Sequence, residues 1–203
     1  MATQHASITD ANRHEAKGAS TASNGQVLKA NGDGSTSFVN PSTLTNVSIT
    51  NVLTGIDLTI QNPSAVDVAL PVTFGNAVAA TDVSLSSGGV LTFNTTGFYV
   101  LDVNLNFQRT AAVGLAKLVS RILVNGTAID PTYYTILTDL ATAQPLYIHL
   151  ERTFNATNTL TVEVLRDSSG IDNGGLYPLD PVLAGWNTSP SAYIKVQKMV
   201  GVA

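Results

Sequence analysis

The sequence predicts an all-β protein whose main domain is a β-sandwich or jelly roll. Three observations favour that fold. Apolar residues recur with a period of two over short runs, Gly, Asn, Asp and Pro end those runs, and no segment shows the convincing apolar spacing of an amphipathic helix. The chain has 203 residues, which suffices for one such domain and an appendage.

The amino-acid composition excludes or disfavours several classes of protein function. Charged residues make up only 12% of the chain and hydrophobic residues 44%, which is typical of a neutral polar surface or of a subunit that hides surface in an oligomer. The net charge of −4 argues against nucleic-acid binding. The chain has no cysteine, which excludes disulfides and thiolate metal sites. The lack of a long apolar run argues against a signal peptide and a membrane span.

The chain is expected to divide into a leader and a body. Residues 1–45 are rich in Ala, Ser, Thr, Asn and Gly, so this leader cannot bury enough surface to order itself alone. Within it, residues 26–30 and the Asn-Gly-Asp-Gly run at 31–34 predict a strand and a tight turn. Residues 46–65 are expected to be a transitional strand or linker, and residues 66–203 the displayed domain.

The body is expected to consist of strands joined by turns. The clearest alternation is at 99–107, where one face is apolar and the other polar. Residues 132–142 are the one place where a helical turn fits, and 167–190 is a long loop. The other expected strands are 56–60, 66–74 with an edge position or bulge at Pro71, 83–85, 90–93, 117–124, 127–129, 146–154, 160–164 and 192–199.

Two segments of the body resemble a known family. The run Phe93-Asn-Thr-Thr-Gly-Phe-Tyr99 leads into a long alternating strand, and the chain ends on the apolar strand Ser191-Ala-Tyr-Ile-Lys-Val-Gln197. Over roughly residues 66–200 the chain looks like the jelly rolls of tumour necrosis factor and complement C1q. That family forms compact trimers around apolar and aromatic strands, so the resemblance implies a homotrimer. We expect Tyr99, Phe107 and Tyr193 in the core or the interface, the first two in the sandwich core and Tyr193 towards the trimer axis.

The leader resembles the start of tailed-phage head fibre and capsid decoration proteins. The similarity lies in Ile8-Thr-Asp-Ala-Asn-Arg-His-Glu-Ala-Lys-Gly18 and in the later run from Gly25 to Ser35. Such sequences often carry Pro where Ala11 and Ala16 stand here. The resemblance implies an N-terminal anchor that grips the major capsid protein. The candidate anchoring residues are Ile8, Thr9, Asp10, His14, Glu15, Lys17 and Gly18.

These features together predict a non-enzymatic virion structural protein. It would decorate the outer capsid surface as a homotrimer, held by its leader, and would stabilise the shell or aid adhesion to the host surface. Three leaders in one trimer would raise the avidity of attachment, and a trimer would match the local three-fold positions of an icosahedral shell. The alternative is a tail-fibre or receptor-binding tip that recognises a host glycan or protein. Tyr177 and Trp186 are the candidate glycan contacts.

An enzymatic function is weighed against this prediction. A glycan hydrolase needs two carboxylates across a groove, and the only Glu residues of the body, Glu151 and Glu163, both alternate out of the apolar phase. No catalytic residue, cofactor or metal is therefore expected. An oxygen-rich loop offers ligands of the kind that calcium binds, from Asp167, Ser169, Asp172, Asn173 and Asp180, but their spacing matches no EF-hand.

Overall fold

The computed structural model describes residues 22–31, 33, 35–40, 48–78, 80–110, 113–129, 131–140 and 143–200. The chain divides into two units, one comprising Met1–Ser48 with Gly201–Ala203 and the other Ile49–Val200. In the first unit, β1 (Val27–Ala30) pairs antiparallel with β2 (Thr36–Val39). The strand and turn expected near residues 26–34 are thus present as one hairpin.

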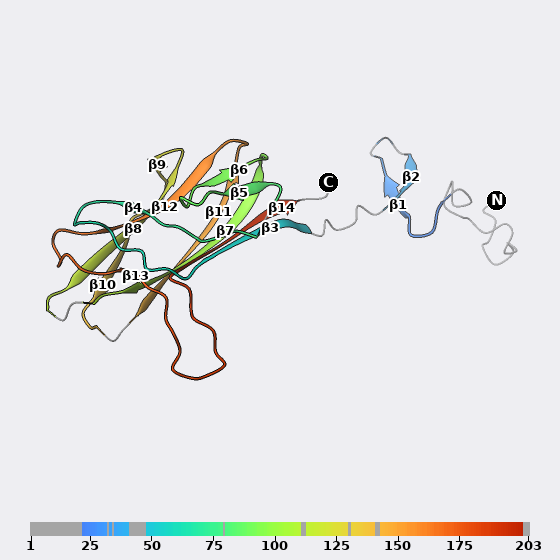
Figure 1. Ribbon diagram of the computed structural model, residues 1–203. Helices are drawn as coiled ribbons and strands as arrows, with labels where there is room; N and C mark the ends of the chain where they lie inside the picture. Colours follow the sequence, from blue (N-terminus) through green and yellow to red (C-terminus); the bar gives the residue numbers. More distant parts are fainter. Residues whose placement is uncertain are drawn as a thin grey trace, which may run out of the picture. The chain divides into compact units, whose positions relative to one another are not determined.

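The second unit is a sandwich of two sheets (Figure 1). No residue that the structure describes lies in a helix, so none provides a helix able to cross a membrane. One sheet has the order β11–β7–β14–β3, with β13 paired to the end of β7. Its strands are β11 (Gln144–Phe154), β7 (Gly97–Gln108), β14 (Ala192–Val200), β3 (Ser48–Asp57) and β13 (Gly175–Leu176).

The second sheet has the order β10–β8–β12–β6–β5. Two short strands extend it, since β4 pairs with β12 and β9 with β8. Its strands are β10 (Tyr133–Leu137), β8 (Ala116–Val124), β12 (Thr159–Arg166), β6 (Leu91–Phe93), β5 (Val83–Leu85), β4 (Leu70–Pro71) and β9 (Thr127–Ala128).

The connections follow jelly-roll topology. The first long strand of the unit, β3, lies beside the last, β14, while β7 to β8, β10 to β11, and β11 to β12 each cross from one sheet to the other. Long antiparallel registers fix the sheet, as Ile148 opposite Val103 and Val103 opposite Ile194 illustrate. The expected all-β jelly-roll sandwich is therefore confirmed.

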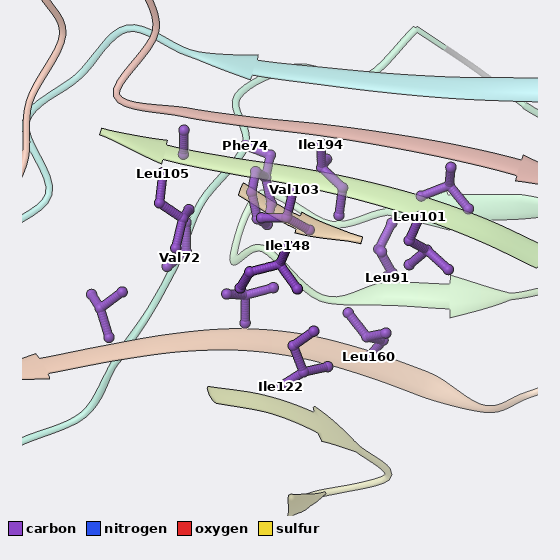
Figure 2. Packing of buried hydrophobic residues seen from close by; sticks show 14 of the residues in the cluster. Val72, Phe74, Leu91, Leu101, Val103, Leu105, Ile122, Ile148, Leu160 and Ile194 are labelled. Atoms are coloured by element: carbon purple, nitrogen blue, oxygen red, sulfur yellow. The ribbon is translucent and has the colours of Figure 1, made fainter. Parts of the chain in front are cut away.

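The core fills the space between the two sheets (Figure 2). Inward residues of β7 face those of β12 and β8, and a cluster of aromatic rings closes one end of this layer. Phe93 stacks on Phe154 with ring centroids 3.9 Å apart, and Tyr99 meets Phe93 edge-on at 4.8 Å. The Tyr99 hydroxyl donates to the Thr95 carbonyl at 2.8 Å, so this fully buried ring leaves no polar group without a partner.

Two expectations about strands were wrong. Residues 66–74 form a strand only at Leu70–Pro71, although the backbone N–H of Val72 still donates to the Val162 carbonyl of β12 at 2.8 Å. Val72 and Phe74 nevertheless enter the core. The helical turn expected within 132–142 is instead the strand β10, whose backbone pairs along β8 from Tyr133 to Leu137.

Candidate self-association surface

Strand β3 presents its apolar residues to solvent. Val52 and Ile56 in the strand, and Leu58 and Ile60 just after it, are 37%, 49%, 54% and 57% exposed. We call these four residues the β3 row. The expected strand at 56–60 thus overlaps the end of β3, and its apolar residues face outward.

The outward orientation of these aliphatic side chains is explained by the polar residues that lie between them in the sequence. Asp57 is buried, and its carboxylate accepts hydrogen bonds from the hydroxyls of Thr59 and Thr73, each at 2.6 Å. Burial raises the pKa of Asp57, but the hydrogen bonds from Thr59 and Thr73 outweigh it, so the net pKa is lowered. Gln61 is also buried, and its side-chain amide exchanges two hydrogen bonds with the backbone of Thr73, at 2.8 and 3.0 Å. Because these hydrogen bonds keep the side chains of Asp57 and Gln61 buried, the alternating aliphatic side chains of Ile56, Leu58 and Ile60 point to solvent.

The rest of this sheet's outer face is also unusually aromatic. Phe98 on β7 is 42% exposed and Tyr147 on β11 is 61% exposed. Tyr147 and the half-buried Tyr193 both lie opposite Asn104 in register, so two tyrosines flank one central amide. The sheet therefore carries apolar and aromatic side chains on the side away from the core, which is uncommon for a solvent-facing surface.

The charges on this face are paired with one another. Asp102 Oδ1 accepts a hydrogen bond from the Tyr147 hydroxyl and lies 2.7 Å from His149 Nδ1, while His149 Nε2 lies 3.1 Å from Glu151. The hydrogen bond with Asp102 is the main cause that raises the pKa of His149, and the hydrogen bond with Glu151 is the second. Lys195 on β14 lies opposite Asp102 in register. Mutual pairing leaves little net charge to oppose the approach of another apolar surface.

A long loop leaves the same sheet between β13 and β14 and projects beyond it (Figure 1). Residues 177–190 form this loop, which we call the arm. Its base is closed by the backbone pair of Leu179 and Ser189, with N···O distances of 3.0 and 2.8 Å. At its tip, residues 181–187 are all exposed.

The structure separates the three aromatic residues expected at the core or interface. Tyr99 and Phe107 are fully buried in the sandwich, whereas Tyr193 lies on the outer face. Tyr177 lies half-buried at the base of the arm, where its hydroxyl accepts from Asn62 at 3.0 Å, and Trp186 is 70% exposed near the tip. The candidate anchoring residues Ile8, Thr9, Asp10, His14, Glu15, Lys17 and Gly18 lie outside the described residues.

The carboxylates do not form a hydrolytic pair in this structure. Glu151 is on β11 and Glu163 is on β12, so they belong to the outward sides of different sheets. Glu163 is bound by Arg121 at 2.7 Å.

The acidic loop weighed for calcium uses its carboxylates in separate contacts. Asp167 accepts from the Ser169 backbone at 2.7 Å, and Asp172 lies 2.9 Å from Arg166. Across the described ranges, no three His, Asp or Glu side chains gather in a group able to hold a metal ion.

The β3 row was not predicted from the sequence to be a surface, because apolar and polar residues alternate there just as they do in a strand whose apolar side chains face the core. The signal that could have revealed it is the pair Asp57 and Gln61 together with Thr59 and Thr73, since a buried carboxylate needs donors of this kind nearby.

No protein-family model and no curated protein matches the chain. Among solved structures, it is similar to Eiger TNF from S. frugiperda, with a TM-score of 0.46 and 10% identity over 76% of this chain and 95% of that one. It is also similar to murine APRIL in crystals at pH 8.5 and pH 8.0. The TM-scores are 0.42 and 0.43 and the identities 15% and 14%, over 73% of this chain and 98% of each of those chains. The jelly roll described above rests on the strand pairing of this chain.

Proposed function

We propose that this protein is a non-enzymatic structural protein of a virion that forms a homotrimer and is held on the outer capsid surface by its N-terminal segment. The observation that carries the self-association is the outward β3 row, because its aliphatic side chains face solvent while Asp57 and Gln61 are buried. Leu53 packs into the core on the inward side of the same strand, so the exposed aliphatic side chains on its outward side are an additional apolar surface, which is typical of a contact with another protein.

Self-association explains this surface better than a purely solvated one. The β3 row begins on β3, the last strand in the order of its sheet, whose outer edge is bonded at Thr54 by the backbone N–H of Val78 at 2.9 Å. Phe98, Tyr147 and Tyr193 extend the surface across the remaining strands. With 12% charged residues in the whole chain, few charges need to be desolvated when such surfaces meet.

The trimeric state is supported by the resemblance of the body to trimeric jelly rolls and by the direction of β3. The backbone N–H of Ser191, just before β14, donates to the carbonyl of Asp57 at 2.9 Å. The end of β3 therefore lies beside the start of β14, and the chain enters the sheet at the opposite end, about 30 Å away for a ten-residue strand. A three-fold axis parallel to the strands would bring three entry points to one end, where three leaders could hold one surface.

Attachment to a capsid is supported by the resemblance of the leader to those of head fibre and decoration proteins. It is tested by mixing the purified full-length protein with empty capsids of its phage and imaging them by cryo-electron microscopy. We expect density at three-fold or quasi-three-fold sites. A variant lacking residues 1–40 serves as the control and should leave capsids bare. Bare capsids with the full-length protein would contradict the proposal and favour a receptor-binding tip on the tail.

A further inference from the structure

We infer that the arm of one subunit clasps a neighbouring subunit of the same trimer, with Leu183 and Trp186 buried against the neighbour's surface around Ile136. This inference rests on the proposed function, because it requires a second copy of the chain. It assigns a role to the one exposed tryptophan, which neither the core nor the β3 row uses.

The base of the arm is held in place by the body. The Asn106 side-chain amide donates to the Pro190 carbonyl at 2.6 Å and to the Ser189 hydroxyl at 3.1 Å, and its backbone carbonyl accepts from Tyr177 N at 3.0 Å. Asn106 is itself buried in β7. One buried residue therefore ties both ends of the arm to β7, through its side chain at one end and its backbone carbonyl at the other, which lowers the entropy lost when the tip is bound.

The tip of the arm is apolar and uncharged. Val182, Leu183 and Trp186 are 106%, 65% and 70% exposed. The Trp186 backbone N–H donates to the Leu183 carbonyl at 3.4 Å, and Gly185 between them has a φ of 89°, so a tight turn presents these side chains. The sequence contains no charged residue from Pro181 to Ile194.

The chemistry of the tip disfavours two other occupants. A sugar site needs polar groups that converge on the ring, but the Thr188 hydroxyl already donates to Asp180, and Ser189 is bonded to Asn106. An anionic membrane surface attracts basic residues, and the sequence has no Lys or Arg between Arg166 and Lys195. An apolar protein surface remains the best match for Val182, Leu183 and Trp186.

A suitable surface lies on the same end of this chain. In one sheet the end of β10 lies beside the start of β8, where Leu137 pairs with Ala116. In the other sheet the start of β11 lies beside the end of β7, where Gln144 pairs with Phe107. The arm leaves from this end as well, because Gly175 pairs with Gln108 at the end of β7. A three-fold axis parallel to the strands keeps this end of each subunit at the same height. The arm of one subunit and this end of its neighbour therefore lie at the same height along that axis.

The receiving end offers exposed aliphatic side chains. Val113, Leu115 and Ile136 are 83%, 47% and 48% exposed. Of these three, Ile136 also lines a hollow of about 80 Å³, together with Leu137, Thr138, Asp139 and Gln144. Covering these side chains with the tip would remove apolar surface of both partners from water in one contact.

The test uses the absence of cysteine from the chain. In the full-length protein, Leu183→Cys combined with Ile136→Cys is oxidised and examined on a non-reducing denaturing gel. We expect covalent dimers and trimers, because each arm reaches the next subunit. The matched control combines Leu183→Cys with Thr127→Cys. Thr127 lies just after the end of β8, at the opposite end of the sandwich from Ile136. This control should remain monomeric on the gel.

Light scattering on the same double variant, before oxidation, separates the two claims. A trimer in solution whose oxidation gives only monomer bands would overturn the clasp and leave the proposed trimer intact. A monomer in solution would overturn the proposed trimer itself and the clasp with it. Either result is readable without knowing any other partner.

Trp186 provides an independent readout, because it is the only tryptophan of the chain. In the trimer we expect blue-shifted emission and protection from acrylamide, both lost in a variant that dissociates. Trp186→Ala should raise the concentration at which half of the trimer dissociates by roughly 30-fold or more, as is typical of a buried interface tryptophan. Emission typical of a water-exposed indole in the intact trimer would overturn the clasp. So would a blue shift that occurs only when phosphatidylcholine vesicles are added.

Discussion

At the scale of single residues, Asp57 determines which way the end of β3 faces. Its carboxylate is buried and accepts from two threonine hydroxyls and from the Thr59 backbone N–H at 2.7 Å. Those bonds are available only if Asp57 points inward, and its neighbours Ile56 and Leu58 must then point outward. The apolar surface is thus a consequence of a polar contact on the other side of the strand.

Asp57→Asn should destabilise the body by about 1–3 kcal/mol at neutral pH, because the amide cannot accept all the hydrogen bonds that the carboxylate accepts. The pKa of Asp57 is lowered in the folded protein from its ordinary value of 3.8. Its contribution is therefore fully present above pH 3.8 and is lost as the pH falls through the folded-state pKa. Urea unfolding of both proteins between pH 7 and pH 3 measures this. Stability curves that stay parallel over that range would contradict the assigned role.

Tyr99 provides a second test at this scale. Tyr99→Ala should cost about 3–5 kcal/mol of unfolding free energy, because it empties a fully buried site beside the stacked rings of Phe93 and Phe154. Tyr99→Phe keeps the ring and should cost only about 1 kcal/mol, the typical net value of one hydrogen bond. Thermal and urea denaturation give both numbers. Equal losses in the two variants would show that the hydroxyl, and not the packing of the ring, stabilises this end of the core.

At the scale of elements, the β3 row is the part of the proposed interface most accessible to mutation. Ile56→Asp should dissociate the oligomer while leaving the unfolding free energy of the body little changed, because the side chain is already 49% exposed in the single subunit. Val68→Asp is the matched control, since Val68 is a similarly exposed aliphatic (45%) in the segment beside the other sheet. Gel filtration with light scattering measures the mass of each. Equal dissociation by both variants would mean that the effect is not specific to the β3 row.

The elements differ in how far the sequence could predict them. Strands such as β7 and β14 bury one side over most of their length, so a period of two is visible in the sequence. β10 was missed because the run from Tyr133 to Leu137 is apolar or β-branched throughout and shows no alternation. Its aromatic and β-branched composition was the available signal.

Other features depend on contacts between distant parts of the chain. The orientation of β3 depends on Thr73, sixteen residues after Asp57. The shape of the arm depends on Asn106, more than eighty residues before Pro190. Sequence periodicity reports on neighbours along one strand and contains no information about such partners. The long loop was therefore predicted, but its fixed base and its projecting apolar tip were not.

At the scale of the whole molecule, the two ends of the body carry different parts of the chain. The chain enters the sheet at the start of β3, and the arm leaves from the other end of the same sheet. Three parallel copies would gather their entry points at one end and their arms at the other. That arrangement suits a module that is attached at one end and stabilised by contacts between subunits at the other.

Removing residues 1–40 should leave this module folded and trimeric, because those residues precede β3 and every strand of the sandwich. The truncated protein should melt at nearly the same temperature as the full-length protein and should fail to join capsids. Calorimetry and capsid co-sedimentation measure the two properties. A truncated protein that still decorates capsids would contradict the anchoring role of the leader.

The central claim is that the outer face of the β11–β7–β14–β3 sheet joins copies of this chain. Sedimentation equilibrium of the full-length wild-type protein tests it most directly, with Ile56→Asp measured beside it. We expect three times the mass of one chain for the wild type at micromolar concentration and a smaller mass for the variant. A wild-type protein that stays monomeric over the whole accessible concentration range would contradict the claim.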